Sequence, residues 1–179
     1  DAMLLRPLPV SDPGRLRFIT FEQLAHDGNV RVSSSFDYPA FRQLRAAVKE
    51  SAELMAISHP TRIDLTYSSD EEMEKAHRQY ISGWTAGTFG LEPAAGRLLT
   101  ASDDVTPGAH PCAVLSYDYW SRRFGRDPGA IGRTFRIGND SYEIVGVLEQ
   151  GFTGTETGTL TDIFLPTMMN AEAVGEPDM

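Results

Sequence analysis

The hydrophobic positions of residues 37–48 repeat with the period of an α-helix. The apolar side chains recur at i, i+3 and i+7, with basic residues between them: Phe41, Leu44 and Val48. Asp37 precedes this pattern and can cap the first turn, and Pro39 falls inside that turn, where its missing N–H costs little. The pattern therefore predicts a helix that begins directly after Asp37.

A second helix is predicted between Ser116 and Gly125. Ser116 can cap its start, and Gly125 can adopt the left-handed conformation that commonly ends a helix. Between them, aromatic residues recur at helical spacing: Tyr117, Trp120 and Phe124. Packing into a core is the preferred interpretation of this aromatic face, ahead of a ligand groove.

Alternation with a period of two predicts strands around these helices. Residues 62–67 alternate polar and apolar side chains, and residues 134–147 do so on both sides of a turn at Gly138–Asp140, as is typical of a hairpin. Further strands are predicted at 16–21, 54–58, 78–84, 114–115 and 162–166, and a short helix at 85–91. Because these elements show no regular β–α–β alternation, the sequence predicts an α+β fold.

The composition describes an acidic chain large enough for one ordinary domain. It has 179 residues, 41% of them hydrophobic, and a formal net charge of −9 at pH 7. Nucleic acid is excluded as a partner, because binding to phosphate requires clustered Lys and Arg. No run approaches the ~18 apolar residues of a membrane helix. The one cysteine, Cys112, lies in an apolar run and is expected to be a buried small hydrophobe rather than a reactive thiol.

Residues with catalytic or metal-binding chemistry are scattered along the chain. The histidines form none of the close pairs typical of metal sites: His26, His59, His77 and His110. Asp103 and Asp104 are adjacent, but a calcium loop needs more oxygen ligands, so a solvated turn is preferred. The serines of 33–35 and 68–69 have no nearby base, and 154–158 lacks the ending of a phosphate loop. We therefore expect no catalytic, cofactor-binding or metal-binding residue.

A set of short motifs runs through nearly the whole chain in a fixed order. The motifs are Leu4–Pro9, Phe36–Phe41, Gly96–Leu98, Ala113–Tyr117, Trp120–Gly125, Ile131–Thr134, Val145–Val147 and Gly151–Gly154. In this order they resemble the extracytoplasmic core domain of MacB-type ABC transporter permeases, particularly the orphan, duplicated permeases that carry this domain after their first membrane helix.

The resemblance implies a single MacB-like periplasmic core region over residues 1–179. It implies a porter-like α/β lobe, expected at residues 16–95 and 148–170, and a smaller inserted mixed α/β lobe, expected at residues 96–147. It also implies an extracytoplasmic (periplasmic) place in a bacterial inner-membrane protein. The implied partners are a second permease unit, a separate or fused ABC ATPase, a periplasmic adaptor, and the membrane through flanking helices.

The chain departs from the family pattern at two places. After Ser-Gly the family carries Asn-Tyr-Phe, whereas here Gly83 is followed by Trp84, Thr85 and Ala86, so the resemblance does not predict where the local helix begins. Cys112 stands where an aliphatic residue is common, which is a change of similar size. The chain is also expected to stop before the family's remaining outer segment and second membrane helix.

Three functions are compatible with these observations. The favoured one is a non-catalytic extracytoplasmic domain that couples cytoplasmic ATP hydrolysis to export or to extracytoplasmic mechanotransmission. The alternative is a stand-alone extracytoplasmic module that binds a ligand or peptide, which predicts a deep apolar cleft. A hydrolase using a serine or Asp103 and Asp104 is third, and predicts a perturbed titratable group beside a nucleophile.

Overall fold

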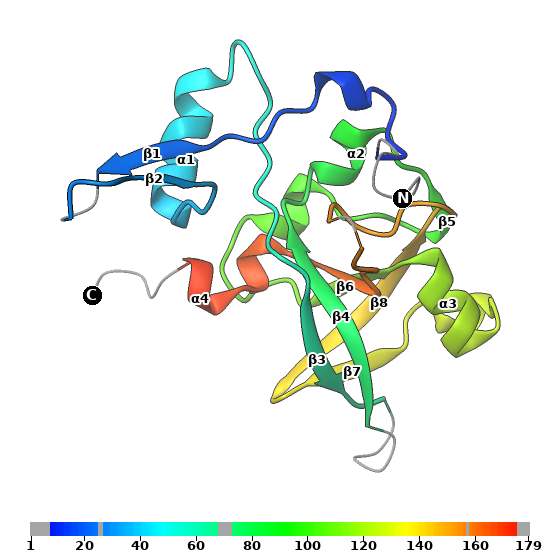
Figure 1. Ribbon diagram of the computed structural model, residues 1–179. Coiled ribbons are helices and arrows are strands. Elements are labelled where there is room, and N and C mark those ends of the chain that lie inside the picture. The colour runs from blue at the N-terminus through cyan, green and yellow to red at the C-terminus, as the bar shows by residue number, and fades with distance from the viewer. Residues whose placement is uncertain (1–7, 25–26, 68–72, 157, 175–179) are drawn as a thin grey trace.

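The computed structural model describes residues 8–24, 27–67, 73–156 and 158–174, and in this part of the chain the strands form two separate sheets (Figure 1). One sheet has two strands and the other has seven. The smaller sheet lies with helix α1 at one side of the molecule, and α3 packs beside the larger sheet at the other (Figure 1). The mixture of helices and strands confirms the predicted α+β class.

The N-terminal unit consists of β1 (Phe21–Leu24), β2 (Val30–Ser33) and α1 (Tyr38–Val48). The predicted helix is confirmed, and the side chain of Asp37 caps it by accepting a 2.7 Å hydrogen bond from the N–H of Ala40. The strand predicted at 16–21 is wrong in its bounds, because the strand begins only where an antiparallel partner is present. That partner, β2, was not predicted.

The seven-stranded sheet has the order β3-β4-β9-β6-β8-β5, and β7 pairs with β8 outside this path. The pairs β4–β9 and β6–β8 are parallel, and the other pairs are antiparallel. The strands are β3 (Thr61–Leu65), β4 (Glu74–Ile81), β5 (Pro93–Gly96), β6 (Cys112–Leu115), β7 (Thr134–Ile137), β8 (Asp140–Leu148) and β9 (Ile163–Pro166). The sheet joins strands from both sides of residues 96 and 147, and the lobe boundaries placed at those residues remain a prediction.

Two predicted strands differ from the structure in detail, and one strand was missed. Residues 54–58 form only an isolated bridge, between Ile57 and Ile81, and the strand predicted at 78–84 is β4, which starts earlier and ends at Ile81. The short strand β5 was missed because it contains Pro93 and two alanines. The acidic residues Asp70, Glu71 and Glu72 lie outside the described residues, and Glu74 begins β4.

The helices beside the large sheet are α2 (Thr85–Phe89), α3 (Tyr117–Phe124) and the short α4 (Ala171–Val174). The predicted caps of α3 are confirmed: Ser116 accepts from the N–H of Tyr119, and Gly125 has φ +59°. The predicted aromatic face is only partly right. Tyr119 is 1% exposed and Trp120 is 7% exposed, because the helix also turns Tyr119 toward β3 and β4.

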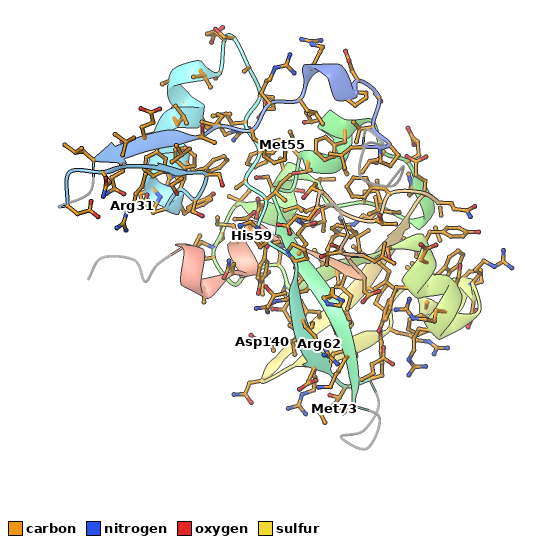
Figure 2. All side chains as sticks on the ribbon, in the orientation of Figure 1. Arg31, Met55, His59, Arg62, Met73 and Asp140 are labelled. Atoms are coloured by element: carbon orange, nitrogen blue, oxygen red, sulfur yellow. The ribbon has the colours of Figure 1, made fainter. Side chains whose placement is uncertain are left out.

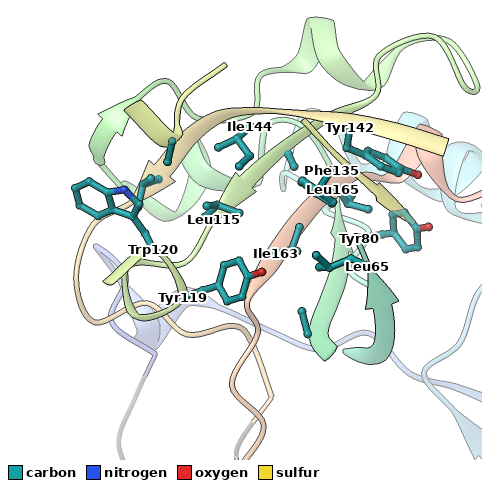
Figure 3. Packing of buried hydrophobic residues seen from close by; sticks show 14 residues of the cluster. Leu65, Tyr80, Leu115, Tyr119, Trp120, Phe135, Tyr142, Ile144, Ile163 and Leu165 are labelled. Atoms are coloured by element: carbon teal, nitrogen blue, oxygen red, sulfur yellow. The ribbon is translucent and has the colours of Figure 1, made fainter. Parts of the chain in front are cut away.

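The large sheet is buried on both faces at its centre. Along β6, Ala113 and Leu115 belong to one hydrophobic cluster and Cys112 and Val114 to the other, which explains why all four positions are apolar. Figure 3 shows the first cluster between the sheet and α3: Leu65, Tyr80, Leu115, Tyr119, Trp120, Phe135, Tyr142, Ile144, Ile163 and Leu165 are labelled. The second cluster lies on the other face, where α2 contributes Ala86 and Phe89.

Candidate functional site

An apolar surface on the N-terminal unit is the strongest candidate for a functional site. Most of the large hydrophobic side chains that are exposed in the described residues lie between positions 18 and 36: Phe18, Ile19, Phe21, Leu24, Val30, Val32 and Phe36. We call this set the 18–36 surface. Single exposed hydrophobic side chains are ordinary, but a contiguous apolar group marks an interaction surface.

The strand register places part of the 18–36 surface on one face of the small sheet. Leu24 pairs with Val30, and Val32 lies two residues further along β2, so all three side chains share a face. Their exposed fractions are 71%, 60% and 66%. A two-stranded sheet is only marginally stable alone and is normally packed against another structure. This exposed apolar face is therefore typical of an interaction surface.

The connection from the N-terminal unit to the large sheet is firmly attached only in its second half. The N–H of Ser58 donates to the carbonyl of Tyr80 at 2.9 Å, and the N–H of Ser82 donates to the carbonyl of Ala56 at 2.9 Å. The side chain of Gln79, fully buried, donates to the carbonyl of Ser58 at 2.8 Å. Residues 56–58 therefore belong mechanically to the body formed by the large sheet, which we call the sheet body.

Asp103 and Asp104 are buried, so the prediction of a solvated turn is wrong. Asp103 accepts hydrogen bonds from Arg97 at 2.7 and 2.9 Å and from the N–H and hydroxyl of Thr100, each at 2.9 Å. Burial by itself raises the pKa of Asp103, but these hydrogen bonds outweigh burial and hold that pKa at about 2. This carboxylate closes a capping box at a short 3₁₀ helix, which is a structural task.

The second carboxylate, Asp104, joins two backbone segments that are distant in sequence. It accepts from the N–H of Gly83 at 3.0 Å and from the N–H of Met168 at 2.7 Å. Burial raises the pKa of Asp104. In the described residues, His, Cys, Asp and Glu side chains form no group of three or more that fits a metal ion.

A partly buried polar network holds α3 against β4 and against the residues that follow β3. The hydroxyl of Tyr119 donates to Glu74 and lies 3.0 Å from the hydroxyl of Tyr67, while Arg123 pairs with Glu74 at 2.7 Å. Burial raises the pKa of Tyr67 to about 12, so this phenol stays protonated at neutral pH. Sequence reasoning missed the network because its members come from three elements, without a common spacing.

The histidines and the cysteine lie in separate places. His59 is exposed and its Nδ1 lies within hydrogen-bond distance of Glu156, and His77 lies 3.9 Å from Asp162 through its ring nitrogen (His59 is labelled in Figure 2). His26 lies outside the described residues. Cys112 is buried as predicted, and burial raises the pKa of its thiol to about 11, which makes the thiolate scarce at neutral pH.

An apolar cavity lies under α2, but it is small. Its volume is about 10 Å³, and residues such as Ala86, Leu99, Val114 and Phe152 line it. A volume of this order corresponds to about one water molecule, which is far below that of a peptide or lipid-like ligand. Among the described residues, no helix has the length and apolar character needed to cross a membrane.

Comparison with known proteins identifies relatives of this fold. A family model described as the MacB-like periplasmic core domain matches residues 4–177. No curated protein sequence gives a significant match. Among solved structures, the extracellular domain of the ABC-type transporter YknZ from Gram-positive bacteria has a TM-score of 0.62 at 18% identity, with 88% of this chain and 76% of that chain covered.

Two further solved structures share the fold. The periplasmic region of MacB from Actinobacillus actinomycetemcomitans has a TM-score of 0.56 at 14% identity, with 80% of this chain and 61% of that chain covered. A domain of a proposed permease protein from Porphyromonas gingivalis has a TM-score of 0.52 at 18% identity, with 76% of this chain and 62% of that chain covered. The matches thus span about three fifths of these two solved chains.

Proposed function

The chain belongs to the family of MacB-like periplasmic core domains, as an extracytoplasmic domain of a MacB-like ABC transporter permease, and on that premise we propose that its function is mechanical. In this proposal the domain couples ATP hydrolysis in the cytoplasm to export, or to mechanotransmission outside the membrane. It changes shape when the distant ATPase cycles, and it performs no chemistry of its own.

The observation that carries the proposal is the separation of the two sheets. β1 and β2 pair only with each other, while the other strands pair in the large sheet. Backbone hydrogen bonds within a sheet resist displacement, so two units without shared strand pairing can shift against each other at lower cost. A relay needs such a division, because coupling requires an element with two arrangements.

The buried ionisable groups support a non-catalytic role. Asp103 is engaged by Arg97 and Thr100, and Asp104 by two backbone N–H groups. A general base or nucleophile needs an accessible lone pair beside a substrate cleft. Each of these carboxylates is already committed to holding segments of the fold together.

The proposed partners follow from the family. They are a second permease unit, a separate or fused ABC ATPase, a periplasmic adaptor, and the membrane through helices that flank the domain. We also keep the two-lobe division at residues 16–95 with 148–170 and at residues 96–147 as a proposal about how the domain is organised, separate from the motion of the N-terminal unit against the sheet body.

The test measures distances within the domain in the full-length transporter. Spin labels are attached at Gln23→Cys on β1 and Asp140→Cys at the β7–β8 turn, two exposed positions on different units (β1 is labelled in Figure 1 and Asp140 in Figure 2). Native Cys112 stays unlabelled at neutral pH, because its thiol is buried. We expect the distance distribution between the labels to shift when ATP binding or vanadate traps the ATPase.

A label pair within one unit is the matched control. Asp140→Cys with Gln150→Cys places both labels on the sheet body, and this distribution should be the same in all nucleotide states. If the 23–140 distribution is also unchanged by nucleotide, the coupling proposal is wrong. If the 23–140 distribution shifts only when a peptide or lipid is added to saturation, and does not change with ATP, the binding-module alternative is favoured.

A further inference from the structure

We propose that the contact between Arg45 and Trp84 is a latch that holds the N-terminal unit in one orientation against the sheet body, with residues 49–54 as the hinge. The latch is a property of the domain and is testable on the 179-residue chain. Its role in transport rests on the proposed function, and the two ideas fail in different experiments.

The two side chains of the latch come from the two units. Arg45 lies on α1, and its guanidinium carbon is 3.7 Å from the centre of the Trp84 ring. Two nitrogens of the same guanidinium donate to Glu53 at 3.0 and 2.7 Å. Because Glu53 orients the guanidinium while the indole stacks on it, the cation is held flat against the ring.

Trp84 also holds the hinge. Its indole N–H donates to the carbonyl of Leu54 at 2.9 Å, so one side chain of the sheet body contacts both α1 and the connecting segment. Release of Trp84 would therefore free Arg45 and Leu54 in one step. A single group that makes two contacts across a boundary favours two discrete arrangements over a gradual loosening.

The backbone on both sides of Trp84 is held in place by the sheet body. The preceding residue, Gly83, donates its N–H to Asp104 at 3.0 Å, and a Cβ at Gly83 would lie 2.1 Å from the carbonyl oxygen of Thr100. The residue after it, Thr85, begins α2 and is 1% exposed. The indole therefore moves with the sheet body.

The hinge residues are attached differently at their two ends. The N–H groups of Ser51 and Ala52 donate to the carbonyl of Val48 at 2.8 and 2.9 Å, so the first part of the hinge is bonded to the end of α1. From Ala56 onward the connection is hydrogen-bonded to β4 and its end, as described above. Between these two anchored parts, the contact at Leu54 is the one through which Trp84 restrains the segment.

Other contacts between the units are compatible with a pivot. Short helix α4 contacts α1, and the N–H of Ser11 donates to the carbonyl of Phe89 at 2.9 Å, which ties the segment before β1 to α2. Each joins a segment near one end of the chain to an internal helix, and neither stacks on Arg45. The latch thus decides which orientation the unit takes.

The test uses Trp84 as its own reporter. The chain has two tryptophans, Trp84 and Trp120, and Trp120 is buried in the core. The variant Trp120→Phe therefore leaves Trp84 as the sole indole. In this background Arg45→Met removes the charge and keeps most of the side-chain length. We expect the acrylamide quenching constant of Trp84 to rise at least about twofold, because the guanidinium that covers the ring is lost. Arg42→Met, on the exposed face of α1, is the matched control and should leave quenching unchanged.

Hydrogen exchange separates release of the latch from general unfolding. In the chain with both tryptophans, Arg45→Met should speed amide exchange in residues 49–54 about tenfold or more and leave β6 and β8 at wild-type rates. Glu53→Gln should give a smaller change in the same direction. Equal quenching and equal exchange in Arg45→Met and wild type would overturn the latch, as would exchange that rises equally in β6 and β8.

In the full-length transporter, the 23–140 distance measurement distinguishes the latch from the coupling proposal. If the latch controls the orientation, Arg45→Met broadens the 23–140 distance distribution before ATP is added. A nucleotide-dependent shift that survives in this variant supports the coupling proposal without the latch. A 23–140 distance distribution that is broadened in Arg45→Met but does not change with nucleotide supports the latch and refutes the coupling proposal.

Discussion

Replacing Gly146 by alanine should separate two strands of the large sheet. Gly146 lies on β8 opposite Gly96 of β5, and a Cβ built on it would lie 1.8 Å from the carbonyl oxygen, 2.7 Å from the carbonyl carbon and 2.9 Å from the nitrogen of Arg97. These are backbone atoms, so no side-chain rotation relieves the clash. The strands must move apart, which also strains the 2.9 Å hydrogen bond from the N–H of Arg97 to the carbonyl of Val145.

The cost follows from these two effects. Overpacking of a tight site costs roughly 1–3 kcal/mol, and weakening one buried backbone hydrogen bond adds about 1 kcal/mol. We therefore expect Gly146→Ala to lose about 3 kcal/mol of unfolding free energy. For a chain of this size that loss lowers Tm by roughly 6–12 °C. Urea unfolding followed by circular dichroism, with a thermal melt, measures both quantities.

Two other glycines calibrate the measurement. At Gly87, exposed in α2, a Cβ would meet no heavy atom within 4 Å, so Gly87→Ala should stabilise the helix by up to about 1 kcal/mol. Gly138 also has open space but has φ +58°, so Gly138→Ala should cost about 1 kcal/mol through backbone strain alone. If Gly146→Ala is no less stable than Gly138→Ala, the steric reasoning is refuted.

Three further predictions concern single side chains. Asp37→Ala should cost about 1 kcal/mol in urea unfolding, because it removes the cap of α1, whereas Asp37→Ser should restore most of this loss. Cys112 should resist iodoacetamide at pH 8 in the folded chain and react on addition of urea, because its thiol is buried with a pKa of about 11; rapid labelling of the native chain would contradict this. Asp103→Asn should be less stable than wild type at pH 7 by roughly 1 kcal/mol after screening by solvent. Because the folded pKa of Asp103, about 2, lies below the ordinary value of 3.8, its contribution is present above about pH 4 and is lost as the pH falls toward 2. Urea unfolding from pH 7 to pH 2 should therefore show the two stabilities converge, and a constant difference would show that the carboxylate charge is not the cause.

Local sequence signals predicted the elements whose stabilising contacts are close in sequence. The helix after Asp37 and the helix between Ser116 and Gly125 are both confirmed with their caps, because a cap joins residues only three or four positions apart. The β7–β8 hairpin is confirmed for the same reason, since its turn places the two strands side by side. The ordered motifs led correctly to the family.

Contacts between distant segments were not predictable in this way. Asp103 and Asp104 had the composition of a solvated turn, and only the packing of Gly83 and Met168 against Asp104 explains their burial. The stacking of Arg45 on Trp84 joins residues 39 positions apart without any shared motif.

The amino-acid pattern was thus sufficient for the α+β class, the main helices and the acidic character of the chain, because these depend on composition and on neighbours within one turn or one hairpin. The order of the seven strands, the separate two-stranded sheet and the exposed 18–36 surface depend on which distant segments meet. Strand pairing across long loops is selected by the burial of both sheet faces at once, and that selection involves the whole chain rather than any one segment.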